Sequence, residues 1–412
     1  MQSCHPYLPE VGITEMTHAL PPSQRHAILT AFGTRPEIIK LAPVLQQLEN
    51  EADVFRTINV SSGQHTDLLV PFVKLFGVRV DRDLQVMRPG QPLNQLFARV
   101  LAELDPILEE EKPSLVLVQG DTTTATAAAL AAFHRRIPVG HVEAGLRTED
   151  PLNPFPEETN RRMISRLATY HFAATDRNYR TLIREGVPKD HVFLTGNPVV
   201  DALQTIRERA EKSPKLQSLL HRTEGKKRIV LTTHRRESFG EIMEGNLRVL
   251  RQFIAAHPDL VLIFPVHPNP QVRENAERLL GNFERIHLTE PMDYPDFIGL
   301  LSESWLIVSD SGGVQEESPS LGKRLLVLRE TTERPEAVES GVAKLAKTPE
   351  MLGDMLATAY CEESSGGLRP MENPFGRGDS GLRIVRAIKQ VLQMGVNEPR
   401  RSETAMTVGV PQ

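Results

Sequence analysis

Residues 115–143 read LVLVQGDTTTATAAALAAFHRRIPVGHVE, and this stretch indicates the fold class. It begins with an apolar run at Leu115–Gln119 and ends with a second apolar run at Val139–Glu143. Between them lies an alanine-rich segment, Thr122–Arg136, which has strong helical propensity. Two strands joined through a helix are typical of the parallel sheets in α/β proteins, so we expect such a sheet here.

The same alternation of short apolar runs and longer amphipathic segments begins at His26 and continues along most of the chain. Further strands are expected at residues 27–32, 55–60, 171–174, 192–195, 228–233, 261–266, 286–288, 306–309, 325–328 and 343–345. Strands that are buried on both faces and separated by helices predict doubly wound parallel sheets. Residues 213–227 are polar and lack a clear strand pattern, so we expect a domain boundary near 200–226. The predicted fold is α/β, with two Rossmann-like domains facing a cleft in which ligands bind.

This boundary divides the chain into a first Rossmann-like domain at residues 26–205 and a second at 206–375. A last helix is predicted within residues 376–396, where apolar residues recur at helical spacing. Residues 1–25 hold several prolines but no apolar signal core, so we expect a disordered leader there. A similar disordered tail is expected at residues 397–412.

The composition argues against several classes of protein. The 412 residues carry a formal net charge of −5, which gives no electrostatic reason to expect a nucleic acid or an anionic membrane as partner. No apolar run approaches the roughly 18 residues that would span a bilayer. Only two cysteines occur, Cys4 and Cys361, so neither a disulfide framework nor a four-ligand zinc site is expected. We therefore expect a cytoplasmic protein.

Polar side chains follow several of the strands predicted in the first domain. The segment Gly33–Glu37, GTRPE, forms a turn into a helix start that suits a phosphate, although a plain surface turn explains it equally well. Asp121 and Glu143 each follow an apolar strand, and Glu157 opens a helix after a proline-rich loop. If Asp121 is considered by itself, a role as the N-cap of the following helix is enough to explain it. Three carboxylates at the ends of elements in one sheet can instead converge as general acids and bases.

The second domain shows the same arrangement with histidines. His234 and His267 each follow a predicted strand. A core position for His234 and a rigid connector at His267 are the alternative interpretations. Two histidines without a matching third ligand are weak evidence for a metal, so no metal site is predicted.

The strongest nucleotide-binding signal in the second domain is SDSGGVQEE at Ser309–Glu317. The Ser311 turn and the following glycine amides suit a diphosphate at a helix start. Glu317, one turn further, suits ribose hydroxyls. Close packing of the helix is the alternative reason for the glycines. Arg334 lies in a second Arg-Pro-Glu loop and is a further candidate cation for the phosphates.

Together these motifs resemble the non-hydrolysing UDP-N-acetylglucosamine 2-epimerases. The resemblance runs from about His26 to Gln393. It rests on Gly33–Glu37, Gly120–Thr123, His141–Arg147, Pro156–Arg161, His234–Glu237, Asp310–Glu317 and Thr332–Glu336. Each motif alone is weak, but seven in this order are specific. The resemblance implies a two-domain GT-B-like fold whose last helix crosses back to the first domain, a homodimer, and a reaction without cofactor or metal.

The resemblance also implies the chemistry. Members of this family interconvert UDP-N-acetylglucosamine and UDP-N-acetylmannosamine by eliminating UDP and adding it back through 2-acetamidoglucal. The product is expected to supply N-acetylmannosamine for surface polysaccharide synthesis.

Individual residues match positions of known role in the family. The matched catalytic positions are Asp121, Glu143, Glu157 and His234. The matched substrate- and UDP-binding positions are Arg35, Lys40, Arg161, His267, Met292, Phe297, Ser311, Gly312, Gly313, Glu317 and Arg334, and His234 also matches a diphosphate contact. Which carboxylate removes the proton and which returns it stays open.

A second, activating substrate site of some relatives is only partly matched. Its candidates here are Gln64, His65 and Arg88, while Thr66-Asp67 departs from the family pattern. Allosteric activation is therefore weakly supported.

Three rival functions use the same architecture or binding site. A GT-B glycosyltransferase would need an acceptor groove rather than a carboxylate cluster. A hydrolysing 2-epimerase would release free sugar, and its members usually lack the motif Arg35-Pro36-Glu37 that this chain has. A nucleotide-sugar sensor would bind without turnover. The motifs favour epimerisation of a UDP-sugar.

Overall fold

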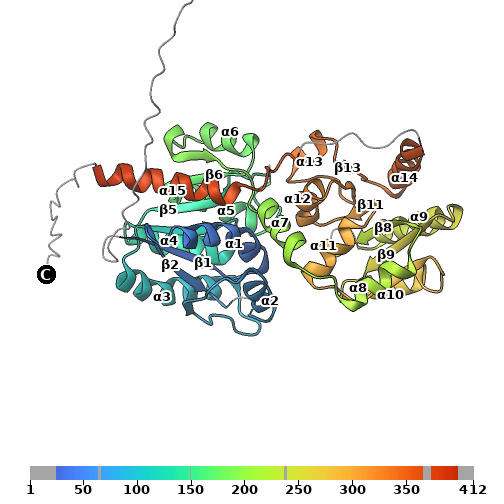
Figure 1. The fold of residues 1–412 in the computed structure, drawn as a ribbon, viewed down its shortest axis with the longest axis horizontal. Coiled ribbons are helices and arrows are strands. Elements are labelled where there is room, and N and C mark those ends of the chain that lie inside the picture. Colours follow the sequence, from blue (N-terminus) through green and yellow to red (C-terminus); the bar gives the residue numbers. More distant parts are fainter. Residues whose placement is uncertain (1–24, 64–65, 149, 236–238, 365–372, 398–412) are drawn as a thin grey trace, which may run out of the picture.

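The computed structural model describes residues 25–63, 66–148, 150–235, 239–364 and 373–397, which form two adjoining lobes (Figure 1). Each lobe is built around one sheet, and every strand pair in both sheets is parallel. The first sheet has seven strands in the order β3-β2-β1-β4-β5-β6-β7. The second has six strands in the order β10-β9-β8-β11-β12-β13. The predicted doubly wound α/β fold is confirmed.

The first sheet consists of β1 His26–Phe32, β2 Phe55–Ser61, β3 Arg82–Asp83, β4 Leu115–Gln119, β5 Val139–Ala144, β6 Tyr170–Ala173 and β7 Val192–Leu194. The accompanying helices are α1 Arg35–Asn50, α2 Thr66–Phe76, α3 Leu93–Glu111, α4 Thr123–His134, α5 Glu157–Leu167, α6 Asp176–Arg184 and α7 Val199–Arg209, with a 3-10 turn at Lys189–His191. Strand β3 was not predicted, because its two residues are exposed and carry no apolar run.

The second sheet consists of β8 Lys227–Thr232, β9 Leu260–Pro265, β10 Ile286–Thr289, β11 Leu306–Ser309, β12 Arg324–Val327 and β13 Ala343–Leu345. The remaining helices are α8 Pro214–Arg222, α9 Glu241–Ala256, α10 Pro270–Leu280, α11 Tyr294–Ser302, α12 Gly312–Ser320, α13 Pro335–Glu339, α14 Pro349–Ser364 and α15 Ser380–Asn397. All strands predicted from the sequence occur, and their ends lie within one residue of the expected positions.

The strand order reverses at one point in each sheet. Strand β1 lies between β2 and β4, and β8 lies between β9 and β11. Connections that leave the two strands at a reversal run to opposite faces of the sheet, so a crevice opens at the carboxyl ends of these strands. The loops at these ends begin at Gly33, Gly120, Thr233 and Asp310. The topology thus directs four of the motif-bearing loops to the two crevices.

The buried strand β4 and the alanine-rich helix α4 contribute to the core of the first lobe. Every residue of β4 is buried, and α4 is buried along nearly all of its length. Alanine allows α4 to approach the sheet closely while α3 and α5 pack against it. Each Leu or Val of β4 contributes about 1.5–3 kcal/mol through burial. These contacts form a rigid support for the loop that carries Asp121.

Helix α15 returns from the second lobe and packs along α1 of the first (Figure 1). Gly381 lies so close to α1 that an added Cβ would be 2.8 Å from the Pro43 carbonyl oxygen. The N–H of Gly381 donates to Asp201 Oδ1 at 2.9 Å. Lys389 pairs with Glu51 at 2.6 Å near the end of α1. The end of the chain described here therefore stabilises the first lobe.

The sheets suggest where the domains divide. Because β7 ends at Leu194 and β8 begins at Lys227, we propose domains at residues 26–205 and 206–375 with a returning segment at 376–396. Helix α15 extends to Asn397, one residue past the predicted limit. The leader and tail expected at 1–25 and 397–412 lie almost wholly outside the described residues.

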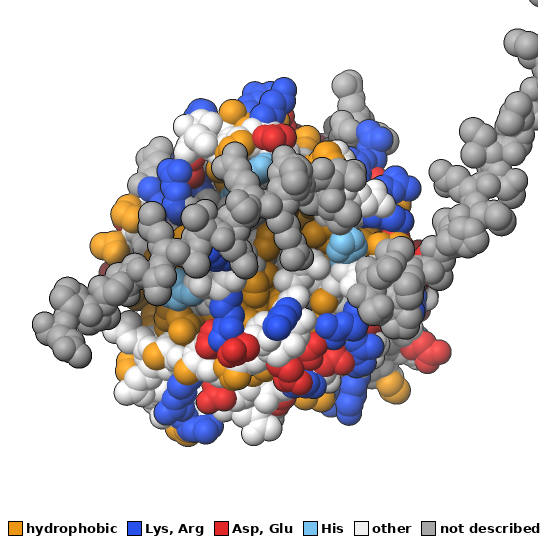
Figure 2. Space-filling view, turned by 90° about the vertical axis from the view of Figure 1, so that its left-hand side faces the viewer, with side chains coloured by type: hydrophobic (Ala, Val, Ile, Leu, Met, Phe, Trp, Pro, Cys, Tyr) orange, Lys and Arg blue, Asp and Glu red, His pale blue; other side chains and the backbone are white. Residues whose placement is uncertain are grey.

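Figure 2 shows the end of the first lobe that lies farthest from the second lobe. Basic and acidic side chains lie side by side along the lower part of this face. Across the described ranges of the chain, none of the helices is both long and apolar enough to cross a membrane.

Candidate active site

Glu143 lies at the end of β5, where the strand pairing shifts. The register between β5 and β6 is irregular between Val142 and Ala144, and Glu143 has a φ of +63°. A left-handed backbone is unfavourable for a glutamate, and such strain is concentrated at functional sites. The Glu143 side chain is only 8% exposed.

The Glu143 carboxylate is held by donors from three elements. Lys40 Nζ of α1 donates to Glu143 Oε1 at 2.5 Å, and Asn197 Nδ2 donates to the same oxygen at 3.3 Å. Gln119 Nε2, from the end of β4, donates to Oε2. Burial raises the pKa of Glu143, while the charge of Lys40 opposes this shift. A buried carboxyl with a raised pKa is suited to proton transfer near neutral pH.

Asp121 follows Gly120 in the loop after β4. Thr122, and not Asp121, is the N-cap of α4, because Thr122 Oγ1 accepts from the Ala125 N–H at 2.9 Å. The N-cap interpretation of Asp121 is therefore wrong. Asp121 Oδ2 instead accepts from Arg161 Nε at 3.0 Å and from Arg161 Nη2. Two charge-assisted hydrogen bonds from one guanidinium hold this carboxylate oxygen in place.

His141 contacts the backbone of the loop that carries Asp121. The His141 Nε2 lies 2.7 Å from the Gly120 carbonyl oxygen, and the side chain is fully buried. Burial lowers the pKa of His141 to about 3, so the ring is neutral at physiological pH. A neutral ring can donate its Nε2 proton to this carbonyl. His141 therefore acts on the loop geometry.

The two glutamates that open α5 have different surroundings. Glu158 is fully buried and accepts from the Thr148 N–H at 2.9 Å and from Arg162 Nε at 2.6 Å. Glu157 is partly exposed; burial raises its pKa, and the charge of Asp121 adds to the shift. Glu157 thus shares its electrostatic environment with Asp121, whereas Glu158 is saturated by structural contacts.

In the second lobe, Asp310 orients the loop after β8. The Asp310 carboxylate is fully buried and accepts from Thr233 Oγ1 at 2.8 Å and from the His234 N–H at 2.9 Å. His234 Nδ1 lies 3.2 Å from Asp310 Oδ1. The exposed His267 ring stacks on His234 with ring centroids 5.6 Å apart. No individual role was predicted for Asp310, although its position between β11 and the Ser311 turn could be read from the motif.

Helix α12 begins beside an arginine. Ser311 is the N-cap of α12 but makes no side-chain cap bond, so its hydroxyl is available to a ligand. An added Cβ on Gly312 would lie 2.9 Å from Arg334 Nη1. Gly313 is exposed. Unbonded amides at a helix start, with a guanidinium alongside, form an anion-binding geometry.

Glu317 lies one turn into α12 and bonds to α11. Tyr294 Oη donates to Glu317 Oε1 at 2.7 Å, and burial raises the pKa of Glu317 to about 7. The Tyr294 ring lies 5.4 Å from the Phe72 ring. The Arg35 guanidinium lies over the Phe72 ring, 5.8 Å from its centroid. An aromatic pair thus connects the first-lobe cation to the glutamate of the second lobe.

The remaining predicted positions fall into two groups. Met292 and Phe297, near the start of α11, are half-buried against the core. Arg88 is exposed, and its guanidinium bonds to the carbonyl oxygens of Met87 and Gln85. Gln64 and His65 lie outside the described residues.

The two lobes meet through a buried ion-pair cluster. Lys40 Nζ, already bonded to Glu143, lies 2.9 Å from Glu316 Oε2 of α12. Arg334 Nε lies 2.6 Å from Glu316 Oε1, and Arg334 Nη1 lies 2.8 Å from Glu333. Although burial opposes ionisation, Arg334 and Lys40 hold the pKa of Glu316 at about 2. The cluster therefore joins the carboxylate site of the first lobe to the start of α12.

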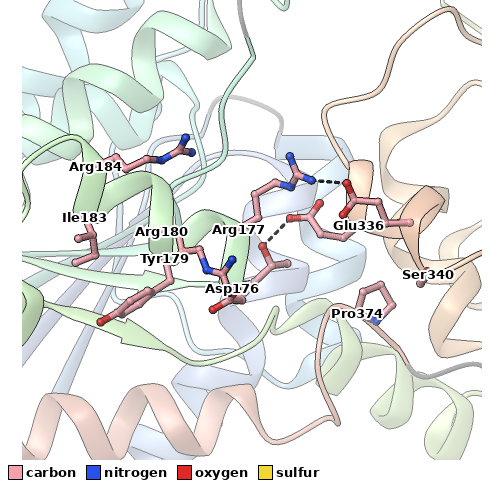
Figure 3. Close-up of a pocket in the computed structure, with 11 residues that line it drawn as sticks. Asp176, Arg177, Tyr179, Arg180, Ile183, Arg184, Glu336, Ser340 and Pro374 are labelled. Carbon is pink, nitrogen blue, oxygen red and sulfur yellow. Dashed lines mark hydrogen bonds and ion pairs between the residues drawn. The ribbon is translucent and has the colours of Figure 1, made fainter.

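A groove of about 830 Å³ marks another part of the lobe boundary, between α6 and α13 (Figure 3). Thr175 Oγ1 donates to Glu336 Oε1 at 2.6 Å across this boundary. Arg177 pairs with Glu339 beside it. Because α13 begins directly after Arg334, these contacts also hold the loop that carries Arg334.

Two doubly wound domains, with carboxylates of one facing a helix start of the other, define an α/β protein of the GT-B-like type. The sequence model of the UDP-N-acetylglucosamine 2-epimerases matches residues 46–389, and the chain belongs to this family. The resemblance seen in the motifs is confirmed.

Individual relatives agree with this assignment. The UDP-N-acetylglucosamine 2-epimerase of Salmonella typhimurium is 45% identical over 369 residues, which cover 88% of this chain and 98% of the relative. The crystal structure of a Neisseria meningitidis UDP-GlcNAc 2-epimerase bound to UDP-GlcNAc aligns with a TM-score of 0.79 at 40% identity, covering 88% of this chain and 100% of that one. The S. aureus MnaA–UDP structure aligns with a TM-score of 0.81 at 38% identity, covering 92% of this chain and 100% of that one.

Proposed function

We propose that this protein is a non-hydrolysing UDP-N-acetylglucosamine 2-epimerase that interconverts UDP-N-acetylglucosamine and UDP-N-acetylmannosamine. The observation that carries the proposal is the position of Lys40, whose ammonium contacts Glu143 of the first lobe and Glu316 of α12 in the second. This contact brings a carboxylate suited to proton transfer next to the helix that offers an anion site. In a sugar nucleotide, the sugar carbon that loses a proton would lie at the carboxylate, and the diphosphate would lie at the anion site.

UDP binds to the second lobe in this proposal. The diphosphate lies at the Ser311, Gly312 and Gly313 turn, with Arg334 and His234 beside it and Arg35 reaching from the first lobe. Support comes from the uncapped start of α12 and from the Arg334 guanidinium packed against Gly312.

The nucleoside lies beyond this turn. Glu317 accepts hydrogen bonds from the ribose hydroxyls, and Met292 and Phe297 hold the uracil. The half-buried Phe297 and the carboxyl of Glu317, already bonded to Tyr294, supply the apolar surface and the acceptor that a nucleoside requires.

The reaction follows from the acidity of the substrate. A proton at C2 of the sugar is weakly acidic, so its removal is coupled to breakage of the C1–O bond and departure of UDP. One carboxylate among Asp121, Glu143 and Glu157 takes the proton, and the bonding electrons form the C1=C2 double bond of 2-acetamidoglucal. Another carboxylate returns a proton to the opposite face of C2, and a UDP oxygen then attacks C1.

Electrostatics assist both stages of this reaction. Arg35, Arg334 and the α12 amides stabilise the charge that develops on the departing diphosphate. Burial raises the pKa values of Glu143 and Glu157, which favours proton exchange near neutral pH. Arg161 orients Asp121, and His267 supports His234 through ring stacking.

A closed cleft keeps the intermediate from water. The contacts that join the lobes, between Lys40 and Glu316 and between Thr175 and Glu336, favour the closed arrangement. Exclusion of water prevents loss of the glycal as free sugar, which would turn the enzyme into a hydrolase. The epimerised nucleotide then supplies N-acetylmannosamine for surface polysaccharides, and the enzyme acts as a homodimer.

Proton NMR of the parent protein with UDP-N-acetylglucosamine in heavy water tests the proposal. We expect deuterium at C2 and a second sugar-nucleotide signal without any acceptor. Free N-acetylmannosamine with UDP would identify a hydrolysing enzyme. Turnover only after addition of an acceptor would identify a glycosyltransferase. Binding without exchange would identify a sensor.

A further inference from the structure

Glu316 lies between two cations that come from different parts of the molecule. Its Oε2 lies 2.9 Å from Lys40 Nζ of the first lobe, and its Oε1 lies 2.6 Å from Arg334 Nε of the second. The side chain is 3% exposed. The next residue, Glu317, bonds to Tyr294 instead. Each of these adjacent glutamates therefore has its own set of partners.

Lys40 extends the influence of Glu316 to the proposed chemistry. The same ammonium that contacts Glu316 donates to Glu143 Oε1 at 2.5 Å. The Lys40 side chain is 10% exposed, so solvent offers it little alternative solvation. Loss of the Glu316 charge would leave Lys40 with one carboxylate partner among these two and allow the ammonium to move away from the lobe boundary.

Charge balance points the same way. Lys40 lies between the buried carboxylates Glu143 and Glu316, and Arg334 lies between Glu316 and Glu333, so removing the Glu316 charge takes an anionic partner from both cations at once. The ion pairs of Glu316 are with Lys40 and Arg334, and neither partner belongs to the Asp121 loop or to the start of α12. Its influence on the site passes through the two cations.

We propose that Glu316 is a positioning residue for epimerisation, which holds Lys40 and Arg334 together across the lobe boundary and thereby sets the Glu143 carboxylate in place. This inference rests on the proposed function. In this role, Glu316 couples closure of the two lobes to the position of the Glu143 carboxylate. Lys40 can contact Glu143 and Glu316 at the same time only when α12 of the second lobe lies close to Lys40.

The pH dependence distinguishes this role from a structural one. The groups that face Glu143 are Lys40, Gln119, Asn197, Glu316 and Arg334. Burial raises the pKa of Glu143, Lys40 and Arg334 lower it, and Glu316 raises it. A glutamine at position 316 removes one raising influence, while Lys40 stays bonded to Glu143, so the pKa of Glu143 should fall. Whether Glu143 is base or acid, the limb of the pH profile that it controls moves to lower pH.

The experiment compares Glu316→Gln and Glu316→Asp with the parent and with Asp201→Asn as matched control. Asp201 is a half-buried residue of α7 whose carboxylate accepts from the Gly381 N–H of α15. For Glu316→Gln we expect kcat to fall about 100-fold, a loss that a displacement of about 1 Å at the reacting centre can produce. Because Arg334 loses its bond to Glu316 but keeps its bond to Glu333, UDP affinity by calorimetry should fall by much less than kcat, and the pH limb should move to lower pH.

Glu316→Asp keeps the charge but is too short to reach both cations, so kcat should fall while the pH limb stays in place. Asp201→Asn should keep the parental kcat and pH profile even if its melting temperature is lower. A parental kcat and pH profile in Glu316→Gln would overturn the positioning role and leave the proposed function standing. Loss of UDP affinity without loss of kcat would also overturn it.

Two further outcomes would show either that Glu316 has only a structural role or that the proposed function itself is wrong. If Glu316→Gln is unfolded by circular dichroism and Glu316→Asp has parental kcat, Glu316 serves stability only and the proposal fails. A parent protein that never places deuterium at C2 of UDP-N-acetylglucosamine would remove the proposed function and this inference together.

Discussion

Replacing Gly312 by alanine is expected to weaken UDP binding through Arg334. The added methyl carbon would lie 2.9 Å from Arg334 Nη1 and 3.2 Å from Cζ, closer than normal carbon contacts. Arg334 cannot retract freely, because its Nε lies 2.6 Å from Glu316 and its Nη1 lies 2.8 Å from Glu333. The guanidinium must therefore give up at least one of these bonds to make room.

The size of the effect follows from the bond that is lost. A hydrogen bond to a charged group contributes about 1.5–3 kcal/mol. Displacing Arg334 by the length of one such bond removes a comparable interaction with the diphosphate. Since about 1.4 kcal/mol corresponds to a tenfold change in affinity, the Kd for UDP should rise about 10- to 100-fold.

Isothermal titration calorimetry with UDP measures this change directly. The matched control is Gly353→Ala in α14, where the added methyl carbon meets its neighbour Val249 at an ordinary 3.6 Å. This control should bind UDP as the parent does, and alanine should favour the helix. Parental UDP affinity in a folded Gly312→Ala protein would refute the position of Arg334 at the diphosphate.

Four further substitutions test the site. Asp121→Asn and Glu143→Gln should each lower kcat about 100-fold or more while UDP affinity by calorimetry stays near the parent value, because general acid–base groups contribute about 10²–10⁴-fold; a large loss of UDP affinity with intact turnover would contradict these roles. Arg35→Ala should raise the Kd for UDP, since it removes a cation from the diphosphate, and unchanged affinity would exclude Arg35 from that site. Glu317→Gln should change the pH dependence of unfolding: the pKa of Glu317 is raised from 4.5 to about 7, so its contribution to stability is full below 4.5 and is lost as the pH rises through 7. Thermal melts from pH 4.5 to 8 should therefore show a steeper fall in melting temperature for the parent than for Glu317→Gln, and parallel curves would contradict the raised pKa.

The strands were predictable because parallel strands between two layers of helices are buried on both faces and read as continuous apolar runs. Leu115–Gln119 and Leu306–Ser309 have the predicted bounds. Strand β3 escaped prediction, because Arg82–Asp83 is exposed and its pairing with β2 needs only two residues. Local composition thus predicts the buried strands but does not predict the exposed edge strand β3.

Candidate site positions were predictable for a related reason. Polar residues directly after apolar strands must lie at the carboxyl edge of a parallel sheet, so Asp121, Glu143 and Ser311 were identifiable as candidates. Their partners were not. Asp121 is oriented by Arg161 from a helix that begins 36 residues later, at Glu157, and neither local pattern nor propensity encodes this pair.

Local patterns in the chain are enough to predict the two doubly wound sheets, the family and the polar loops that meet at the sheet edges, because burial pattern and strand-end position are local properties. The different roles of neighbouring glutamates, in contrast, depend on how the chain folds. Glu158 is saturated by Arg162 and Thr148 while Glu157 is partly exposed, and Glu316 joins the two lobes while Glu317 bonds to Tyr294. Successive residues on a helix point about 100° apart, and what each one meets depends on elements that are distant in the chain.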